Sequence, residues 1–227
     1  MRQKQDFFGM MGGRVQMRRG IYNPTADAVW LAAAAPRAKR VLDVGIGSGG
    51  VALCYLAHHP DAQMTGIDVS TDMLGAATDN AQLNDRTIDF IHADITTWRT
   101  SDTFDLVMTN PPYFMGTPAR HNAHHNADLN TWIRRCVARV RPRGIFCTIV
   151  DAAVLDTVIT AIAPTCGDIT IFPLMGGKDT AERVIIRARM GTRGGTRLYS
   201  GLSMNDERIL RDGLTIADIF TMLGTKC

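Results

Sequence analysis

The chain has 227 residues, of which 45% are hydrophobic and 21% charged, with 21 glycines and 9 prolines. These proportions exclude a disordered, collagen-like or low-complexity chain. The formal charge is only +3, but residues 43–105 carry −8 and the rest of the chain +11. This asymmetry predicts a basic face for a polyanion beside a neutral or cationic small-molecule site, with an ordinary solvated surface as the alternative.

The sequence carries no signal for a membrane, a secreted chain or a metal site. Its longest apolar stretch, residues 28–36, is too short to cross a bilayer, and residues 1–13 lack the apolar segment of a signal peptide. The five cysteines form no CxxC pair, which favours reduced, buried thiols over disulfides or zinc. We therefore expect a soluble cytoplasmic protein, taken as a monomer.

Apolar runs alternate with helical patterns along most of the chain. A first helix is predicted over 25–35, and Arg141-Pro142 should stop the helix of 129–140. Ser70 or Thr71 is the expected N-cap of the helix of 71–84. The pattern predicts strands at 40–45, 62–68, 87–94, 104–110, 144–151, 168–174 and 183–190, and further helices at 49–59, 71–84, 129–140 and 154–165.

The order of these elements predicts an α/β protein with a doubly wound, Rossmann-like sheet and helices on both faces. Residues 175–182 are too few for a crossover helix, so the last two strands should be antiparallel. A seven-stranded mixed sheet with an antiparallel last strand is typical of class I methyltransferases. We expect an N-terminal extension, residues 1–39, comprising a basic arm and a capping helix, followed by one catalytic domain, residues 40–227.

A glycine-rich loop, Gly45-Ile46-Gly47-Ser48-Gly49, follows the first strand of this sheet. Glycine allows the tight turn and a close approach of backbone to a ligand at the next helix N-terminus. Asp43 precedes the loop, where its carboxylate can face a cationic amino group. The loop lacks the third glycine of the NAD fingerprint, and S-adenosyl-L-methionine is the cofactor we expect, with NAD or flavin as alternatives.

Two further carboxylates follow the next two strands. Asp68 is placed to bind ribose hydroxyls and Asp94 to meet an adenine amino group, although both side chains can instead cap the helices that follow. Three acidic strand ends suit a ligand that carries a sulfonium and an ammonium group. The expected cofactor contacts also include Gly49, Val69, Ile95 and Asn110.

The tetrapeptide Asn110-Pro111-Pro112-Tyr113 follows the fourth strand and is the predicted catalytic motif. The Asn110 side-chain oxygen and the Pro111 carbonyl can accept hydrogen bonds from a flat, conjugated amino group and present its lone pair to a methyl donor. Proline holds Asn110 in an extended conformation, which orients both acceptors in advance. Tyr113 offers a face on which an unpaired base can stack. A proline-rich turn without function is the alternative.

With these motifs the chain resembles the NPPY-motif methyltransferases, and within them the bacterial tRNA(Val) adenine-N6 methyltransferase family. The resemblance rests on residues 12–35, DVGIGSGGVALCYLA, NAQLN, FDLVMTNPPYF and IFPLMGGKDTAERVIIRARMG. It implies S-adenosylmethionine-dependent N6-methylation of an adenine in RNA, in tRNA next to the anticodon. It also places Tyr22 and Asp27 over the methionine end of the cofactor.

Other functions share the tetrapeptide. Glutamine methylation of a release factor is expected to need a larger N-terminal helical domain, and methylation of rRNA guanine N2 or of DNA adenine an added domain. A non-catalytic RNA-binding module that keeps the cofactor pocket is a further alternative. The sequence leaves the target nucleotide and the oligomeric state open.

Three groups of residues lie outside the motifs above: histidines, tryptophans and arginines. His121, His124 and His125 lie in a polar loop with no nearby Cys or Glu, so we expect a substrate-facing loop and no metal. Trp30, Trp98 and Trp132 are expected to be core residues. The candidate nucleic-acid contacts are Arg14, Arg18, Arg19, Arg183, Arg187 and Arg189, although Arg183 has acidic neighbours.

Overall fold

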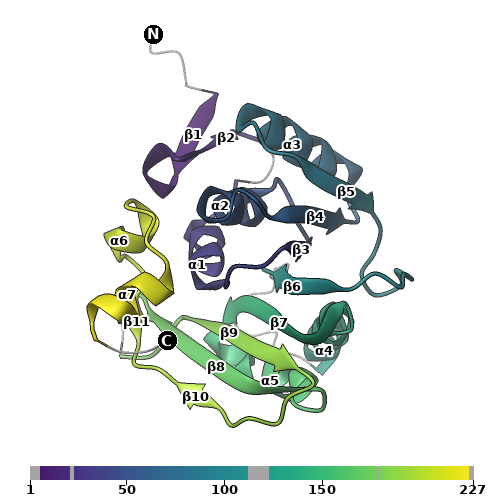
Figure 1. The fold of residues 1–227 in the computed structure, drawn as a ribbon, viewed down its shortest axis with the longest axis vertical. Coiled ribbons are helices and arrows are strands. Elements are labelled where there is room, and N and C mark those ends of the chain that lie inside the picture. The colour runs from purple at the N-terminus through teal and green to yellow at the C-terminus, as the bar shows by residue number, and fades with distance from the viewer. Residues whose placement is uncertain (1–5, 21–22, 112–122, 178, 225–227) are drawn as a thin grey trace.

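The computed structural model describes residues 6–20, 23–111, 123–177 and 179–224. Within these ranges the chain forms a twisted mixed sheet covered by helices on both faces, with a small hairpin at its N-terminal side (Figure 1). The predicted Rossmann-like α/β fold of class I methyltransferases is confirmed. No helix of the described segments is long and apolar enough to span a membrane.

Seven strands form the predicted mixed sheet. In spatial order they are β8, β9, β7, β6, β3, β4 and β5, and β9 lies antiparallel between β7 and β8. The strand β9 therefore supplies the expected antiparallel hairpin with β8. The strands are β3 (Arg40–Val44), β4 (Gln63–Asp68), β5 (Ile88–His92), β6 (Phe104–Thr109), β7 (Val140–Asp151), β8 (Cys166–Met175) and β9 (Arg183–Met190).

The helices divide the hydrophobic core between the two faces of the sheet. One core lies under α1 (Ala26–Ala34), α2 (Gly50–His58) and α3 (Thr71–Leu83). The other lies under α4 (Ala123–Val137) and α5 (Leu155–Ile162), which a short 3-10 helix (Ala152–Val154) precedes. Ser70 is the N-cap of α3, as predicted, and its side chain accepts a hydrogen bond from the Met73 amide.

Four cysteines are confirmed as buried free thiols: Cys54, Cys136, Cys147 and Cys166. Burial raises their pKa values, that of Cys54 to about 12. They therefore act as core residues. The fifth cysteine, Cys227, lies outside the described residues.

The N-terminal extension contains a hairpin that the sequence analysis missed. Strands β1 (Phe7–Met10) and β2 (Val15–Arg18) pair antiparallel around a short 3-10 helix (Met11–Gly13). Val15 and Met17 are buried, whereas Gln16 and Arg18 are exposed. This alternation is the signature of a half-buried strand, but four residues are too few to distinguish it from a loop.

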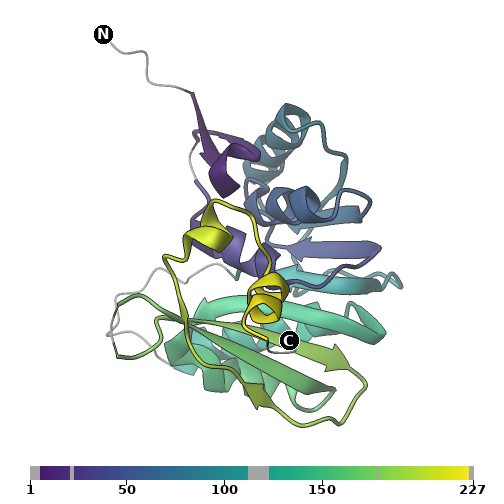
Figure 2. The same cartoon turned by 60° about the vertical axis from the view of Figure 1, so that its left-hand side comes forward.

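The C-terminal residues also form elements that were not predicted. Strands β10 (Arg197–Leu198) and β11 (Leu202–Ser203) pair with β8 and bring the described sheet to nine strands. Helices α6 (Glu207–Leu210) and α7 (Ile216–Met222) pack on the face that carries α1 (Figure 2). Each is short, and only contact with the main core explains why it is ordered.

The position of Pro142 corrects one expectation. The helix α4 ends at Val137, and Pro142 lies within β7 instead of marking a helix end. The pairing of β7 with β6 shifts here, since Phe104 pairs with Val140 and Leu106 with Ile145. The residues between form a bulge, and a bulge tolerates a proline because no ladder hydrogen bond is required of it.

Candidate active site

A cavity of about 500 Å³ opens at the carboxyl ends of the parallel strands. Its walls come from residues 44–48 at and after the end of β3, 67–69 at and after the end of β4, 93 and 95 after β5, and 110–111 after β6. The start of α1 and the side chain of Trp132 close it. Ligands bind at this edge of open α/β sheets, and the volume suits a cofactor-sized molecule.

The glycine loop turns sharply because three of its residues have left-handed backbone conformations. Gly45, Gly47 and Gly49 have φ values of +71°, +55° and +91°. The Gly45 and Ile46 amides both donate to the carbonyl of Ile67, which ties the loop to β4 at 2.9 and 3.1 Å. The loop thereby leads directly into α2, whose first residue, Gly50, also lines the cavity.

Asp68 orients this loop through its carboxylate. One oxygen accepts the Gly47 amide and the other the Ser70 amide, both at 2.9 Å. Each carboxylate oxygen has a second lone pair, so Asp68 retains acceptor capacity toward the cavity that it lines. The residue links two walls of the cavity and can still bind hydroxyl groups of a ligand.

Asp43 is almost completely buried, at 1% exposure, and is not among the residues that line the cavity. Burial raises the pKa of its carboxyl to about 7; a hydrogen bond from the Ala52 amide opposes this rise and the nearby Asp68 adds to it. Its Oδ2 has no hydrogen-bond partner among the described residues. A buried carboxylate oxygen of this kind is costly unless a cation or donor reaches it.

Asp94 does not line the cavity, although its neighbours Ala93 and Ile95 do. Its Oδ1 accepts hydrogen bonds from the Thr96 amide at 2.7 Å and the Thr96 hydroxyl at 2.8 Å. The side chain thus caps the turn after β5. Of the three strand-end carboxylates, Asp68 alone contributes to the lining of the described cavity, whose surface is mainly apolar.

Asn110 and Pro111 lie on the same cavity as the glycine loop and Asp68. Asn110 Oδ1 is buried and has no hydrogen-bond partner among the described residues, and the same holds for Ser48 Oγ. Buried acceptors without a partner are rare in folded proteins, so both atoms are candidates for contact with a ligand in this cavity. Pro112 and Tyr113 of the motif, and Tyr22, lie outside the described residues.

Asp27 is placed differently from the expectation of a cofactor contact. Its carboxylate is buried in α1 and pairs with Arg183 Nε at 3.2 Å, and Arg183 also reaches Asp151 at 3.2 Å. Neither Asp27 nor Gly49 lines the cavity. The pair joins α1 to β7 and β9 next to the site.

The remaining candidate arginines fall into two regions. Arg14, Arg18 and Arg19 are exposed on and beside the N-terminal hairpin. Arg187 stacks over Phe172 at 4.9 Å and donates to the Ala34 carbonyl, and Arg189 pairs with Asp168 at 3.8 Å. No metal-binding group of His, Cys, Asp or Glu occurs among the described residues. His124 and His125 were expected in a loop, but they lie in the first turn of α4, and His121 lies outside the described residues.

Trp132 and Thr109 are site residues that the sequence analysis did not identify. The Trp132 indole donates to Thr109 Oγ1 at 3.0 Å, and Thr109 Oγ1 donates to the Val44 carbonyl at 2.9 Å. A Cβ on Gly45 would lie 3.2 Å from Trp132 Cζ2. The expectation that Trp132 is only a core residue is therefore incomplete. Its position beside the cavity depends on how α4 packs.

Comparison with known proteins agrees with this geometry. Residues 41–144 match a family described as a methyltransferase domain. The structure resembles a predicted O-methyltransferase from Agrobacterium tumefaciens, with a TM-score of 0.65, 26% identity, and coverage of 79% of this chain and 88% of that one.

Two groups of curated proteins are similar in sequence. A tRNA1(Val) (adenine(37)-N6)-methyltransferase from Aeromonas hydrophila is 29% identical over 73% of this chain and 75% of that protein. A release factor glutamine methyltransferase from Caulobacter vibrioides is 47% identical, but only over 32% of this chain and 26% of that protein. In three of these curated relatives the aligned segment covers 26%, 37% and 62% of the relative's length, so the chain spans less than two thirds of each.

Proposed function

Because the chain has the sequence and fold of a class I S-adenosylmethionine-dependent methyltransferase, we propose that it methylates N6 of an adenine in RNA. A tRNA, at the adenine next to the anticodon, is the proposed substrate. The observation that carries the proposal is the buried Asn110 Oδ1, which has no partner in the described part of the chain and lies on the cavity formed by the glycine loop.

The cavity fits S-adenosyl-L-methionine in size and in the groups around it. Asp68 lines the cavity and is the residue proposed for its ribose hydroxyls. Asp43 does not line the cavity, and it is proposed for the ammonium group only because its buried Oδ2 has no partner among the described atoms. Ile46, Val69 and Ile95 offer apolar walls. When bound, the cofactor supplies a methyl group on a sulfonium centre, which a nitrogen lone pair can accept.

Asn110 and Pro111 are proposed to hold the acceptor amino group. An exocyclic amine on an aromatic ring is flat, because its lone pair is delocalised into the ring. Asn110 Oδ1 and the Pro111 carbonyl would accept hydrogen bonds from its two N–H groups. These bonds would draw the nitrogen toward a tetrahedral geometry, in which the lone pair is free to react. Acceptors fixed before the substrate arrives lower the barrier by positioning. No general base is required, since the product cation readily releases a proton.

RNA is favoured as the substrate class by the relatives and by the distribution of charge. The Aeromonas relative, which covers most of this chain, is named for an adenine in a tRNA. Arg14, Arg18 and Arg19 are exposed at the N-terminal hairpin, where a phosphate backbone can meet them. An unpaired loop adenine costs little to extract, because it has no partner strand. A tRNA substrate would place the reaction in the cytoplasm.

A glutamine side chain is the second candidate acceptor. The match to the Caulobacter protein is the specific observation in its favour, and that protein is named for methylation of a release factor. A primary amide presents the same flat nitrogen as adenine, so the same two acceptors would serve. The two candidates therefore differ in the macromolecule that is bound and share the proposed chemistry.

The test offers cofactor with a labelled methyl group to total tRNA, rRNA, DNA and a purified release factor, followed by nucleoside and peptide mass spectrometry. We expect N6-methyladenosine in tRNA alone. The Asn110→Ala variant should bind S-adenosylhomocysteine normally and lose turnover, whereas Asn205→Ala, at an exposed asparagine, should keep both. Labelled glutamine, or full activity of Asn110→Ala, would refute the assignment. Binding of cofactor without methylation of any acceptor would favour a non-catalytic RNA-binding module.

A further inference from the structure

A second large cavity lies at the opposite edge of the sheet from the active site. It has a volume of about 830 Å³ and is bordered by the segment before β3, by the starts of β6 and β8, by the bulge of β7 and by the end of β9. The active-site cavity lies at the carboxyl ends of the parallel strands, so the sheet separates the two. We call this second cavity the basic groove. It is lined by Arg37, Lys39, Arg141, Arg143, Arg187, Arg189 and Arg197.

Two carboxylates also line the groove, and each already has a partner. Asp105 pairs with Arg141, and Asp168 pairs with Arg189 at 3.8 Å. Lys39, Arg143 and Arg197 are exposed and form no ion pair with any residue of the described ranges. The groove therefore keeps an excess of positive charge, and clustered like charges favour a bound anion.

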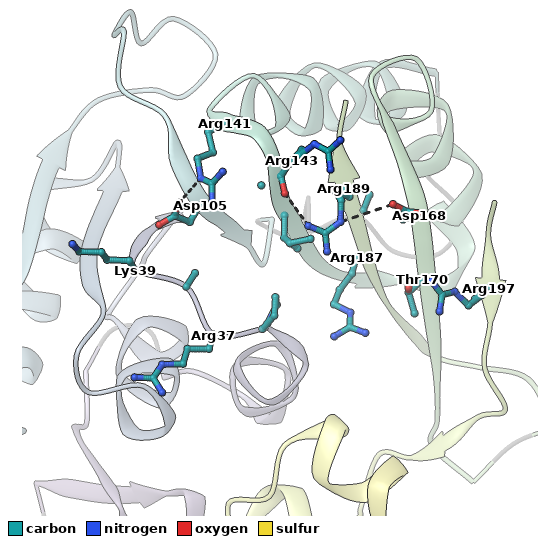
Figure 3. Close-up of a pocket in the computed structure, with 15 residues that line it drawn as sticks. Arg37, Lys39, Asp105, Arg141, Arg143, Asp168, Thr170, Arg187, Arg189 and Arg197 are labelled. Carbon is teal, nitrogen blue, oxygen red and sulfur yellow. Dashed lines mark hydrogen bonds and ion pairs between the residues drawn. The ribbon is translucent and has the colours of Figure 1, made fainter. Parts of the chain in front are cut away.

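The fold brings these cations together from distant parts of the chain. Because β9 lies between β7 and β8, Arg189 is opposite Ile145 of β7 while Arg187 is opposite Thr170 of β8. Strand β10 then places Arg197 beside Thr170. Figure 3 shows the basic side chains distributed across the groove from Lys39 to Arg197, without converging on one point. This spacing suits a ligand with several separated negative charges.

Arg143 lies beside Arg189 in the groove. It has a φ of +63°, a left-handed conformation that favours glycine and disfavours arginine. Its carbonyl accepts a hydrogen bond from Arg189 at 2.9 Å, which holds the two residues side by side. Arg143 lies in the bulge of β7, where an irregular backbone of this kind occurs, and its side chain lines the groove.

We infer that the basic groove binds backbone phosphates of the RNA substrate, at a distance from the base that is methylated. This inference rests on the proposed function for the identity of the polyanion. Phosphate contacts fix the orientation of a nucleic acid without reading its sequence. Since the groove and the active site lie at opposite edges of the sheet, the groove acts on RNA affinity and leaves the chemical step unchanged. Arg187 and Arg189, expected from the sequence to bind nucleic acid, lie in it.

The test compares wild-type protein with the double variant Arg143→Glu/Arg197→Glu, which changes two arginines without an ion pair among the described residues. The control is Arg99→Glu, which makes half the change in net charge, because Arg99 is exposed outside the groove and its side chain donates only to the Thr97 carbonyl within the described chain. Fluorescence anisotropy of a labelled tRNA gives the affinity over a series of salt concentrations. Circular dichroism verifies that each variant is folded, and calorimetry verifies that it binds S-adenosylhomocysteine.

We expect the double variant to bind tRNA at least ~10-fold more weakly, with a slope of log affinity against log salt reduced by about 1.5. Its kcat at saturating tRNA should match the wild type. Unchanged tRNA affinity, or an equal loss in Arg99→Glu, would overturn the inference. A second experiment replaces tRNA with inorganic polyphosphate. If the double variant loses polyphosphate binding but keeps tRNA binding, the groove binds a phosphate ligand other than RNA, and this result also overturns the inference.

The outcomes for the groove and for the proposed function are distinguishable. If the double variant loses tRNA affinity but no RNA is methylated by any form of the protein, the groove is confirmed and the reaction is wrong. If tRNA is methylated and the double variant binds it normally, the reaction is confirmed and the groove is wrong.

Discussion

The indole nitrogen of Trp132 donates a hydrogen bond to the buried hydroxyl of Thr109 across 3.0 Å. Thr109 is the last residue of β6 and its hydroxyl donates in turn to the carbonyl of Val44, the last residue of β3. One chain of hydrogen bonds thus joins α4 to the two strands that carry the glycine loop and Asn110. Trp132 lies against Gly45 as a result.

We predict that Thr109→Val weakens cofactor binding as well as stability. Valine has the same shape as threonine but leaves the Trp132 N–H and the Val44 carbonyl without their partner, which should cost about 2 kcal/mol of unfolding free energy. The freed loop should weaken S-adenosylhomocysteine binding by about tenfold, or about 1.4 kcal/mol. Urea denaturation and calorimetry measure the two effects.

Thr148→Val is the control for this prediction. Thr148 is equally buried and donates to the Thr109 carbonyl at 2.9 Å, but its hydroxyl does not reach the glycine loop. It should lose about 1 kcal/mol of stability and bind the cofactor product normally. Equal affinities of Thr109→Val and the wild type would show that the hydrogen-bond chain does not hold the loop.

A second prediction concerns Gly45→Ala. Alanine at a φ of +71° is strained by about 1–2 kcal/mol, and its Cβ would lie 3.2 Å from Trp132 Cζ2. The loop must shift, so stability should fall and S-adenosylhomocysteine affinity should fall with it, as calorimetry would measure. Gly75→Ala is the control, because Gly75 is exposed within α3 and its Cβ would meet nothing within 4 Å. That variant should gain about 0.5–1 kcal/mol and keep its affinity; matching behaviour of the two variants would contradict the assigned role of Gly45.

The buried carboxyl of Asp43 predicts a pH dependence of stability in the cofactor-free protein. Burial raises its pKa to about 7, so the native state keeps a proton that the unfolded chain releases near pH 4. Between about pH 4 and pH 7 the native state therefore binds more protons than the unfolded state, and stability falls as the pH rises through this window. Above pH 7 both states are ionised and this contribution is constant.

Asp43→Asn should remove this pH dependence. Urea denaturation at pH 5 and pH 8 should show that the wild type loses about 2 kcal/mol more than the variant. The asparagine oxygen can still accept from the Ala52 amide, so the variant is expected to fold. Superimposable pH profiles for the two proteins would mean that the Asp43 carboxyl titrates in its ordinary range.

The sequence was sufficient for the features that depend on neighbouring residues. The run Val41–Val44, the glycines with positive φ and the N-cap Ser70 each specify their conformation locally, and alternation of strands and helices determines the sheet. Asn110 was expected to contact the cofactor, and it lies on the cavity with the glycine loop because β3 and β6 are adjacent parallel strands. Reasoning from the sequence failed where a position depends on packing across the sheet, as with Trp132 against Gly45.

The basic groove shows the same limit for charge. Clusters of arginine were visible in the sequence, but Lys39, Arg143 and Arg197 line one groove only because segments distant in sequence meet at the same edge of the sheet, to which β10 adds. Asp27 and Arg183 are 156 residues apart and pair for a similar reason. No local pattern distinguishes an arginine that pairs with a buried carboxylate from one that faces an anion.

The last prediction separates these two roles for Arg183, which joins Asp27 and Asp151. The Asp27 side chain is 7% exposed and that of Asp151 46% exposed, so the same guanidinium makes one buried and one solvated ion pair. Arg183→Gln and Asp27→Asn should each lower the free energy of unfolding by about 2 kcal/mol, and the double variant by less than their sum, because each removes the same buried pair. Asp151→Asn should cost less than about 0.5 kcal/mol, since exposed pairs contribute little. Urea denaturation of the four variants measures the coupling. Additive losses would show that Asp27 and Arg183 are not coupled, and a loss of RNA affinity in Arg183→Gln at unchanged stability would assign Arg183 to phosphate binding.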